Sequence, residues 1–479
     1  MGYRVVDVIA EHLTSLPGRP VFRPLPPEVA AAFLAEPAPH AGSAPEAILD
    51  EFGARVEPYP FGNGHPRFWG WVNPPPEVMA IFAAALAAAM NPSVAGGNHA
   101  AVYVEHQVLN WFKTLLGFPE TAMGLLVSGG SMATLTGLAV ARHVAAREAG
   151  IDVRARGLQD GGAPFVVYMG EEGHSCIRKA VELLGIGSDQ LRVIASDDRF
   201  RLPPAALEAH IRRDLAAGLR PVAVVASAGT VNTGAIDPLA DLAAVCRRYR
   251  VWLHVDGAYG APAILAGAYR AELQALALAD SLALDPHKWL YVPVEAGLVM
   301  VRDGPAMRDA FSLVPPYLRT DGSPTGVGGP PWFSEFGLEQ TRGFRALKVW
   351  MALKHQGLDG YRALVEHDLA LAAHLAARVA ASPDLELMAR GLSVVCFRFA
   401  PPALRADPQG LDRLNQALLQ AMQLGGQAFL SSTTLRGSFV LRACLINPRT
   451  TVADVDALVD LVRQTGARLA GQGLPQGNP

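Results

Sequence analysis

The chain has 479 residues, of which 50% are hydrophobic and 18% are charged, and its formal net charge is −3. A chain of this length and composition can bury a sizeable core and is expected to form two or more lobes. The near-neutral charge, without a long basic block, argues against nucleic acid or an anionic membrane as the main partner.

The cysteines and the N-terminal segment bear on the cellular compartment. Residues 1–7 hold an early acidic residue and no long apolar core, so no secretory signal is expected. The most apolar segment, residues 78–90, is shorter than the roughly 20 residues that cross a bilayer. The cysteines have no CxxC spacing, which excludes the common zinc frameworks; they are Cys176, Cys246, Cys396 and Cys444. We therefore expect a cytoplasmic protein without a metal site.

Residues 1–74 are predicted to form an N-terminal helical arm. Apolar spacing predicts a helix over Val5–Leu16, and a Pro-rich span follows to about Tyr59. Residues 61–71 are dense in aromatic rings and turn formers. This segment is interpreted either as a packed corner or as one wall of a substrate pocket.

Residues 75–358 are predicted to form a large α/β domain. Helices are expected over residues 77–90 and 102–116, and the Gly-Gly-Ser turn at residues 129–131 opens a long helix that reaches about Arg147. Such a turn leaves backbone N–H groups free to hold a phosphate, although Ser131 is also a good N-cap.

Strands then alternate with helices. Helices near residues 175–184, 204–217 and 239–248 separate four predicted strands, which lie near residues 164–169, 191–195, 221–226 and 251–255. This alternation indicates a largely parallel sheet covered by helices, with ligands at the carboxyl ends of its strands. Polar residues that suit chemistry follow four strand ends: His174, Thr230, Asp256 and Lys288.

Lys288 follows an apolar run, residues 281–284, and lies between His287 and Trp289. Lysine normally lies in water, so this setting predicts a partly desolvated amine whose lowered pKa suits Schiff-base chemistry. The plainer interpretation is a strand-end lysine whose stem packs on a tryptophan while its head reaches solvent.

The rest of the chain is predicted to form a loop-rich segment and a small C-terminal α+β domain, residues 359–479. The segment of residues 304–343 is longer than most connections without secondary structure, and loops of this kind often act as lids. Helices are expected over residues 344–355 and 361–381. The small domain is expected to have strands near residues 392–399 and 438–446 and helices near 411–422 and 452–470.

A lysine, an aspartate, a histidine and an open helix N-terminus together predict a site for pyridoxal 5'-phosphate. Lys288 would hold the cofactor covalently, and Asp256 would pair with the pyridine nitrogen, because an adjacent carboxylate favours the protonated ring. His174 would stack on the ring, and Thr230 would contact it. Three residues would receive the phosphate: Gly130, Ser131 and His287.

Five segments resemble those of the group II pyridoxal-dependent amino-acid decarboxylases, most nearly the aromatic-L-amino-acid branch. They are residues 127–131, 173–175, 251–259, 285–289 and 435–442. The resemblance covers almost the whole chain. It implies fold type I, the aspartate-aminotransferase fold, with a mostly parallel seven-stranded sheet. It also implies an intertwined homodimer with the site at its interface and an amino acid as substrate.

The resemblance implies roles for single positions. Lys288 corresponds to the Schiff-base lysine, Asp256 to the pyridinium partner and His174 to the stacking histidine. Further cofactor contacts are implied for Gly130, Ser131, Thr230, Ala258, Asp285 and His287, and substrate contacts for Trp71, Pro74 and Ser93. Asp285 falls where the family often has an asparagine near the phosphate.

Two positions depart from the family pattern. Met132 replaces an acidic residue after the Gly-Gly-Ser turn. Counting back from residues 343–345 places Phe333 where the family's lid carries a tyrosine that protonates the substrate after carbon dioxide leaves. Tyr317 is the nearest tyrosine upstream and is interpreted as a packed aromatic. Phenylalanine at the lid position implies an aldehyde synthase, which releases an aldehyde, ammonia and peroxide.

Three rival functions remain open. A serine hydrolase using Ser131, with His174 or His254 as base, would need a Gly-x-Ser-x-Gly turn, and Ala133 replaces its last glycine. Transamination on the same fold is a second rival, although the Asp-Pro-His-Lys context favours decarboxylation. A catalytically inactive scaffold is a third, but drift would be expected to remove the charges of Lys288 and Asp256 first.

An aromatic L-amino acid is the expected substrate. The rings of Phe68, Trp69 and Trp71 could form an aromatic box, and the same rings could belong to the core. No arginine can be assigned to a second substrate carboxylate, so glutamate and aspartate are less favoured.

Overall fold

The computed structural model describes residues 1–159, 162–314 and 326–472, and the chain divides into two compact units. Unit 1 comprises residues 1–75 and the described residues from 367 onward, and unit 2 comprises residues 76–366, apart from its two undescribed stretches. The domain boundaries predicted near residues 74 and 358 stay predictions. Among the described residues, none of the helices has the apolar length that a bilayer crossing requires.

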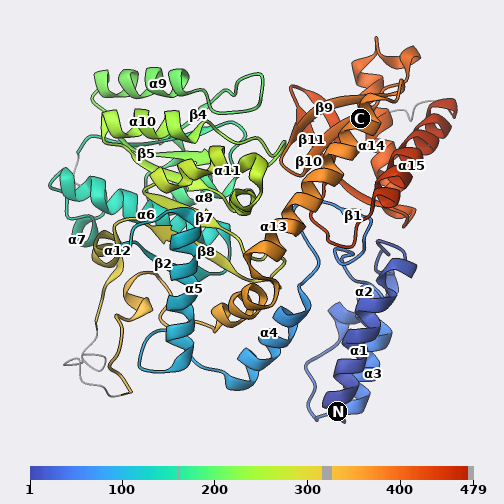
Figure 1. Cartoon of the computed structure of the whole chain (residues 1–479), viewed down its shortest axis with the longest axis horizontal. Coiled ribbons are helices and arrows are strands. Elements are labelled where there is room, and N and C mark those ends of the chain that lie inside the picture. Colours follow the sequence, from blue (N-terminus) through green and yellow to red (C-terminus); the bar gives the residue numbers. More distant parts are fainter. Residues whose placement is uncertain (160–161, 315–325, 473–479) are drawn as a thin grey trace. The chain divides into compact units, whose positions relative to one another are not determined.

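Unit 2 is built on a seven-stranded sheet with the order β2-β8-β7-β6-β5-β3-β4 (Figure 1). Strands β3 to β7 run parallel, whereas β8 pairs antiparallel with both β7 and β2. The strands are β2 Met123–Val127, β3 Phe165–Gly170, β4 Leu191–Ile194, β5 Arg220–Ser227, β6 Trp252–Asp256, β7 Ser281–Leu284 and β8 Gly297–Val301. The predicted α/β class and mostly parallel seven-stranded sheet are confirmed.

Helices cover this sheet because its central strands are apolar on both faces. Every residue of β3, β7 and β8 is buried, as expected for strands that pack against helices on two sides. Figure 1 shows α9 and α10 side by side next to β4 and β5. The helices are α4 Val78–Met90, α5 Ala100–Leu116, α6 Gly130–Glu148, α7 Val153–Arg156, α8 Cys176–Leu183, α9 Pro204–Ala216, α10 Leu239–Tyr249, α11 Gly267–Leu273 and α12 Gly304–Phe311.

Helix α12 corrects the prediction of a loop over residues 304–343. It begins where the Asp303 carboxylate accepts the N–H of Ala306 at 2.9 Å, with Pro305 in the first turn. Residues 315–325 of the same segment, including Tyr317, lie outside the described residues. The interpretation of Tyr317 as a packed aromatic therefore stays a prediction.

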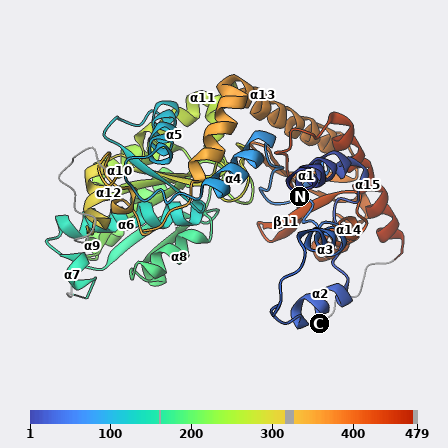
Figure 2. The ribbon, with the colours of Figure 1, turned by 90° about the horizontal axis from the view of Figure 1, so that it is seen from below.

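Unit 1 contains a five-stranded sheet with the order β1-β11-β12-β10-β9. Only its first pair, β1 with β11, is parallel. The strands are β1 Phe68–Trp69, β9 Leu385–Gly391, β10 Val394–Phe399, β11 Phe429–Leu435 and β12 Ser438–Cys444. Figure 2 shows helices α14 Pro408–Leu424 and α15 Val452–Gly471 near β11, and α14 packs on both β11 and α15.

The remaining helices of unit 1 include two that the sequence prediction missed. Helix α1 covers Gly2–Ser15, close to its predicted position, whereas α2 Pro27–Ala35 and α3 Pro45–Arg55 lie in the segment predicted only as Pro-rich. Both begin with proline in the first turn, where its missing N–H costs nothing. Helix α13, Arg345–Ala380, starts in unit 2 and is broken at Gly357, between the two helices predicted there.

A buried ion pair ties three segments of unit 2 together. Arg342 and Glu105 have side chains that are 1% and 0% exposed and pair with each other. The Arg342 guanidinium also donates to the carbonyls of Val94 at 2.9 Å and Leu126 at 2.8 Å, and Glu105 accepts the N–H of Leu126 at 3.0 Å. Each charge is therefore compensated inside the core.

Removing the negative charge should destabilise unit 2 strongly. We expect Glu105→Gln to lower the free energy of unfolding by about 3 kcal/mol, because the buried Arg342 loses its close partner and keeps the partly exposed Glu339 carboxylate at 3.9 Å. The exposed Glu148→Gln on α6 is the matched control, with an expected change below about 0.5 kcal/mol. Equilibrium urea unfolding measures both, and equal values for the two variants would contradict the role of the pair.

Candidate active site

The parallel strands of unit 2 bring the four predicted polar residues to one edge of the sheet. Asp256 ends β6 and lies opposite Ala283 of β7, and Lys288 follows β7 in a turn. His174 follows β3 and Thr230 follows β5, which run in the same direction. The carboxyl ends of parallel strands are where ligands bind in open α/β sheets.

Lys288 is held by a neighbouring carboxylate. Its Nζ lies 2.9 Å from Asp285 Oδ2, and the two side chains are 25% and 2% exposed. Burial disfavours the ammonium, but the charges of Asp285 and Asp256 outweigh burial, so the pKa of Lys288 lies above its ordinary value. The lowered pKa expected from the sequence is wrong for the chain without a cofactor, because the sequence-based argument counted burial and left out the two carboxylates.

Asp256 and His174 are each fixed by a backbone N–H. The Asp256 carboxylate accepts the N–H of Ala258 at 3.1 Å, and His174 Nδ1 accepts that of Cys176 at 3.1 Å. Burial lowers the pKa of His174, and the charge of Asp256 opposes this effect. The ring is thus neutral near pH 7, and the residue is exposed at the sheet edge. It is free to contact a flat ligand.

The start of α6 forms a narrow cradle with the turn that follows β7. A Cβ on Gly130 would lie 3.0 Å from Ala258 Cβ and 3.0 Å from Asp285 Oδ2, and one on Gly129 would lie 3.4 Å from His287 Cε1. No side chain of the described structure caps α6, so the N–H groups of its first turn stay available. Asp285 Oδ1 is buried without a hydrogen-bond partner in the described structure. The start of α6 fits a phosphate, the Lys288 amine fits an aldehyde with which it can react, and the Asp256 carboxylate fits a pyridine ring.

Two of the predicted cofactor residues make contacts of their own. The buried Thr230 hydroxyl lies 3.0 Å from Thr233 Oγ1 and accepts the N–H of Ala235 at 3.0 Å. His287 Nδ1 lies 2.7 Å from the carbonyl oxygen of Ala296, which fixes the ring. The contacts of both residues with a cofactor stay predictions.

The predicted substrate residues belong to different units. Ser93 is exposed in unit 2, whereas Trp71 and Pro74 belong to unit 1. Trp71 is 46% exposed and stacks on Phe61 with 5.3 Å between ring centroids. The two other rings of the suggested aromatic box, Phe68 and Trp69, are 3% and 1% exposed and are core residues. Of the three rings, only Trp71 keeps a free face for a substrate.

Phe333 is fully buried in unit 2. Its ring stacks on His106 at 4.5 Å between centroids, and the guanidinium of Arg342 lies 4.9 Å from its centroid. The assignment of Phe333 to the lid position stays a prediction. The sequence prediction missed His106 and Arg342, because no motif marks them and only the folded chain brings residues 106, 333 and 342 together.

Cys176 is a further site residue that the sequence prediction missed. Burial raises the pKa of its thiol to about 12, and the nearby charge of Asp256 adds to the effect. The hydroxyls of Thr134 and Ser131 partly oppose this rise in the pKa, and α8 packs on α6. The sequence signal that could have identified Cys176 is its position two residues after His174.

The serine hydrolase rival gains no support from His254, one of its two candidate bases. His254 is fully buried, with Nδ1 2.8 Å from Ser281 Oγ and Nε2 3.3 Å from Thr134 Oγ1. Burial lowers the pKa of His254 to about 4. A ring that is enclosed by two hydroxyls and not in contact with Ser131 is a structural group.

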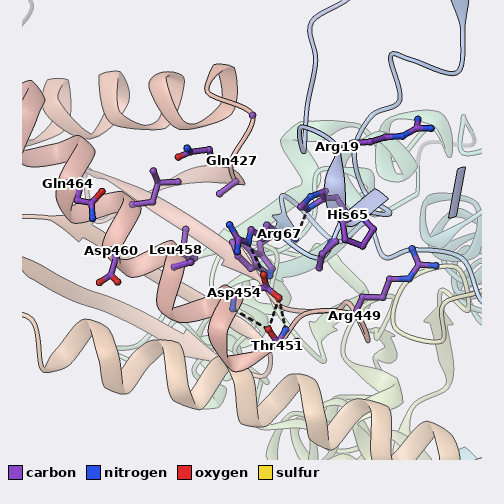
Figure 3. A pocket seen from close by; sticks show the side chains of 17 residues that line it. Arg19, His65, Arg67, Gln427, Arg449, Thr451, Asp454, Leu458, Asp460 and Gln464 are labelled. Carbon is purple, nitrogen blue, oxygen red and sulfur yellow. Dashed lines mark hydrogen bonds and ion pairs between the residues drawn. The ribbon is translucent and has the colours of Figure 1, made fainter. Parts of the chain in front are cut away.

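A separate cavity of about 750 Å³ lies within unit 1 (Figure 3). Figure 3 shows Arg67 beside Asp454, and Arg67 Nε donates to Asp454 Oδ1 at 2.8 Å. Asp454 also forms a capping box with Thr451 at the start of α15. A second arginine of the lining, Arg19, pairs with Glu57. Of the residues predicted for cofactor or substrate, Trp69 of the suggested aromatic box lines this cavity, and none of the predicted cofactor residues does.

Comparison with known proteins gives consistent similarities. Residues 27–400 match the family model described as the pyridoxal-dependent decarboxylase conserved domain. An aromatic-L-amino-acid decarboxylase of Bacillus atrophaeus is 36% identical over 458 residues, 95% of this chain and 92% of the relative. The Oryza sativa TDC solved with PLP and tryptamine is 27% identical, with a TM-score of 0.89, and the match covers 98% of this chain and 97% of that one. The Rhodiola rosea 4-hydroxyphenylacetaldehyde synthase is 26% identical, with a TM-score of 0.84 and coverages of 98% and 97%.

The Lys288–Asp285 pair generates a prediction for the chain without a cofactor. Asp285→Asn removes the main charge that raises the pKa of Lys288, so we expect that pKa to fall. Only the neutral amine reacts with acetic anhydride, so labelling of Lys288 should begin at lower pH in the variant. Peptide mass spectrometry measures this, with the exposed Lys179 as internal control. An unchanged pH profile at Lys288 would contradict the assigned role of Asp285.

Proposed function

The chain belongs to the family of pyridoxal-dependent decarboxylases, and on that basis we propose that it converts an aromatic L-amino acid to its amine and carbon dioxide. The observation that carries the proposal is that Asp256 ends β6 and Lys288 follows the adjacent parallel strand β7. The Lys288 amine lies beside the Asp285 carboxylate. The aromatic preference rests on the names of the similar proteins, an aromatic-L-amino-acid decarboxylase and a TDC solved with tryptamine.

Pyridoxal phosphate, when bound, supplies an electron sink for the electron pair left on the substrate Cα as carbon dioxide departs. Lys288 would hold the cofactor, and Asp256 would face its ring nitrogen. The phosphate would lie at the N-terminus of α6, where an uncapped helix start favours an anion. The residues proposed to receive it are Gly130, Ser131 and His287.

The chain's own groups set the charges and the contact surface of this site. The N–H of Ala258 donates to the Asp256 carboxylate and holds it in one orientation, so the negative charge keeps a fixed position. His174 offers the face of a neutral ring. Lys288 Nζ, 2.9 Å from Asp285, is the amine that binds the cofactor and can carry a proton to or from the reacting carbon.

Aldehyde synthesis is a second candidate function, and a specific residue favours it. If Phe333 occupies the lid position, no hydroxyl is available there to protonate the reacting carbon. Oxygen and water would then be consumed, and the substrate would yield an aldehyde, carbon dioxide, ammonia and peroxide. A 4-hydroxyphenylacetaldehyde synthase is among the similar structures.

Product analysis distinguishes these reactions. The cofactor-loaded protein is incubated in air with a panel of aromatic, acidic and aliphatic L-amino acids, and amines, aldehydes and peroxide are measured. We expect amine from an aromatic substrate and at least about 10³-fold less product with Lys288→Ala, because the amine that binds the cofactor is lost. Aldehyde with equimolar peroxide would favour the second candidate. Faster turnover of an acidic or aliphatic amino acid would contradict the aromatic preference.

We also propose that the protein is a cytoplasmic homodimer with its active site at the subunit interface. The family resemblance supports the dimer, and the four buried cysteines, which have no CxxC spacing, are consistent with a reducing compartment. Light scattering after gel filtration should give about twice the monomer mass, and a monomer at all concentrations would contradict the proposal.

A further inference from the structure

Asp285 is a buried carboxylate that uses only part of its hydrogen-bonding capacity. Its side chain is 2% exposed, and Oδ2 lies 2.9 Å from Lys288 Nζ. Oδ1 is also buried, and nothing in the described part of the chain donates to it. A buried carboxylate oxygen without a donor is unfavourable, so a missing partner is expected at this point.

The Asp285 carboxylate lies beside the start of α6. A Cβ on Gly130 would be 3.0 Å from Asp285 Oδ2, so the carboxylate contacts the first residue of this 19-residue helix. The helix start has no side-chain cap, and Asp285 itself does not provide one. The place that favours an anion therefore already has a negative charge next to it.

The charges around Asp285 leave Lys288 as its counter-ion. His287 Nε2 is 3.8 Å away, but burial lowers the pKa of that ring and leaves it neutral near pH 7. The first turn of α6 carries no acidic or basic residue. Other titratable groups near the site are Asp256 at the end of β6, His174 before α8, Cys176 and Lys179 on α8, and Lys348 on α13. Lys348 Nζ already donates to the carbonyls of Pro293 at 3.1 Å and Glu295 at 2.7 Å.

We propose that the chain binds pyridoxal phosphate together with one proton, which is held between Asp285 Oδ1 and a phosphate oxygen. The inference rests on the proposed function. The Lys288 nitrogen would join the aldehyde carbon as water leaves, and it would keep one proton and its positive charge, so forming this bond exchanges no net proton with solvent. The nitrogen would then lack the N–H groups with which the free ammonium pairs with Asp285. Asp285 then faces the phosphate without those N–H groups, and two anions at one helix start repel each other. A proton taken from solvent removes one negative charge and turns Oδ1 into a hydrogen-bond donor.

Asparagine at this position would need no proton. Its amide is nearly the same shape as a carboxylate and presents N–H donors at every pH. The affinity of Asp285→Asn for the cofactor should therefore depend less on pH. The affinity of the wild-type protein should fall by up to about tenfold for each pH unit above the phosphate's own titration near pH 6, because each binding event takes up a proton.

The experiment is a titration of the full-length, cofactor-free protein with pyridoxal phosphate between pH 7 and 9. Absorbance gives Kd at each pH, and calorimetry in two buffers of different ionisation enthalpy gives the number of protons taken up. Proton uptake is compared at pH 7, where the Lys288 amine of both proteins is most fully protonated within this range, and we expect the wild-type protein to take up about one proton more than Asp285→Asn. Asp309→Asn is the matched control, because its side chain is 59% exposed on α12, and it should behave as wild type.

The outcomes separate this inference from the proposed function. Equal proton uptake and equal pH dependence in the wild type and Asp285→Asn would overturn the inference, while cofactor binding itself would still support the function. Zero proton uptake by the wild type would overturn it even if the variant does not fold. A wild-type chain that binds no pyridoxal phosphate at any pH would contradict the proposed function as well.

Discussion

The parallel pairing of β6 with β7 is the constraint on which the candidate site depends. It sets Asp256 opposite Ala283, so the turn after β7 must begin beside the carboxylate that ends β6. The same parallel arrangement extends through β5 and β3, which aligns the segments that carry Thr230 and His174. A shift of one residue between β6 and β7 would turn Asp256 to the other face of the sheet.

The pKa of Lys288 at this edge of the sheet depends on the charged side chains close to it. Burial alone would make Lys288 a weaker base, but the two carboxylates near it reverse the direction of its pKa. The same carboxylate that stabilises the ammonium lies at the helix start proposed for the phosphate. One residue, Asp285, thus links the charge of the lysine to the charge of the ligand.

The sequence predicted the α/β unit well because its signals are local. Apolar runs ended by polar residues predict β3, β5, β6 and β7, and these ends carry the proposed site residues. The missed elements lack such signals: α2 and α3 are hidden in a Pro-rich span, and β8 is a five-residue apolar run, which periodicity alone does not distinguish from part of a buried helix. The pKa of Lys288, the stacking of Phe333 on His106 and the buried pair of Arg342 with Glu105 depend on contacts between distant residues, which no local pattern encodes.

The parallel pairing of β1 with β11 has a consequence for how the protein is made. Phe68 pairs with Phe429 and Trp69 with Leu430, so in the described part of the chain the first strand finds its partner strand more than 350 residues later. During synthesis the N-terminal segment leaves the ribosome long before that partner exists, and its aromatic rings have no sheet to pack on. Unit 1 is therefore completed last, and its N-terminal segment is a natural client for chaperones while translation continues.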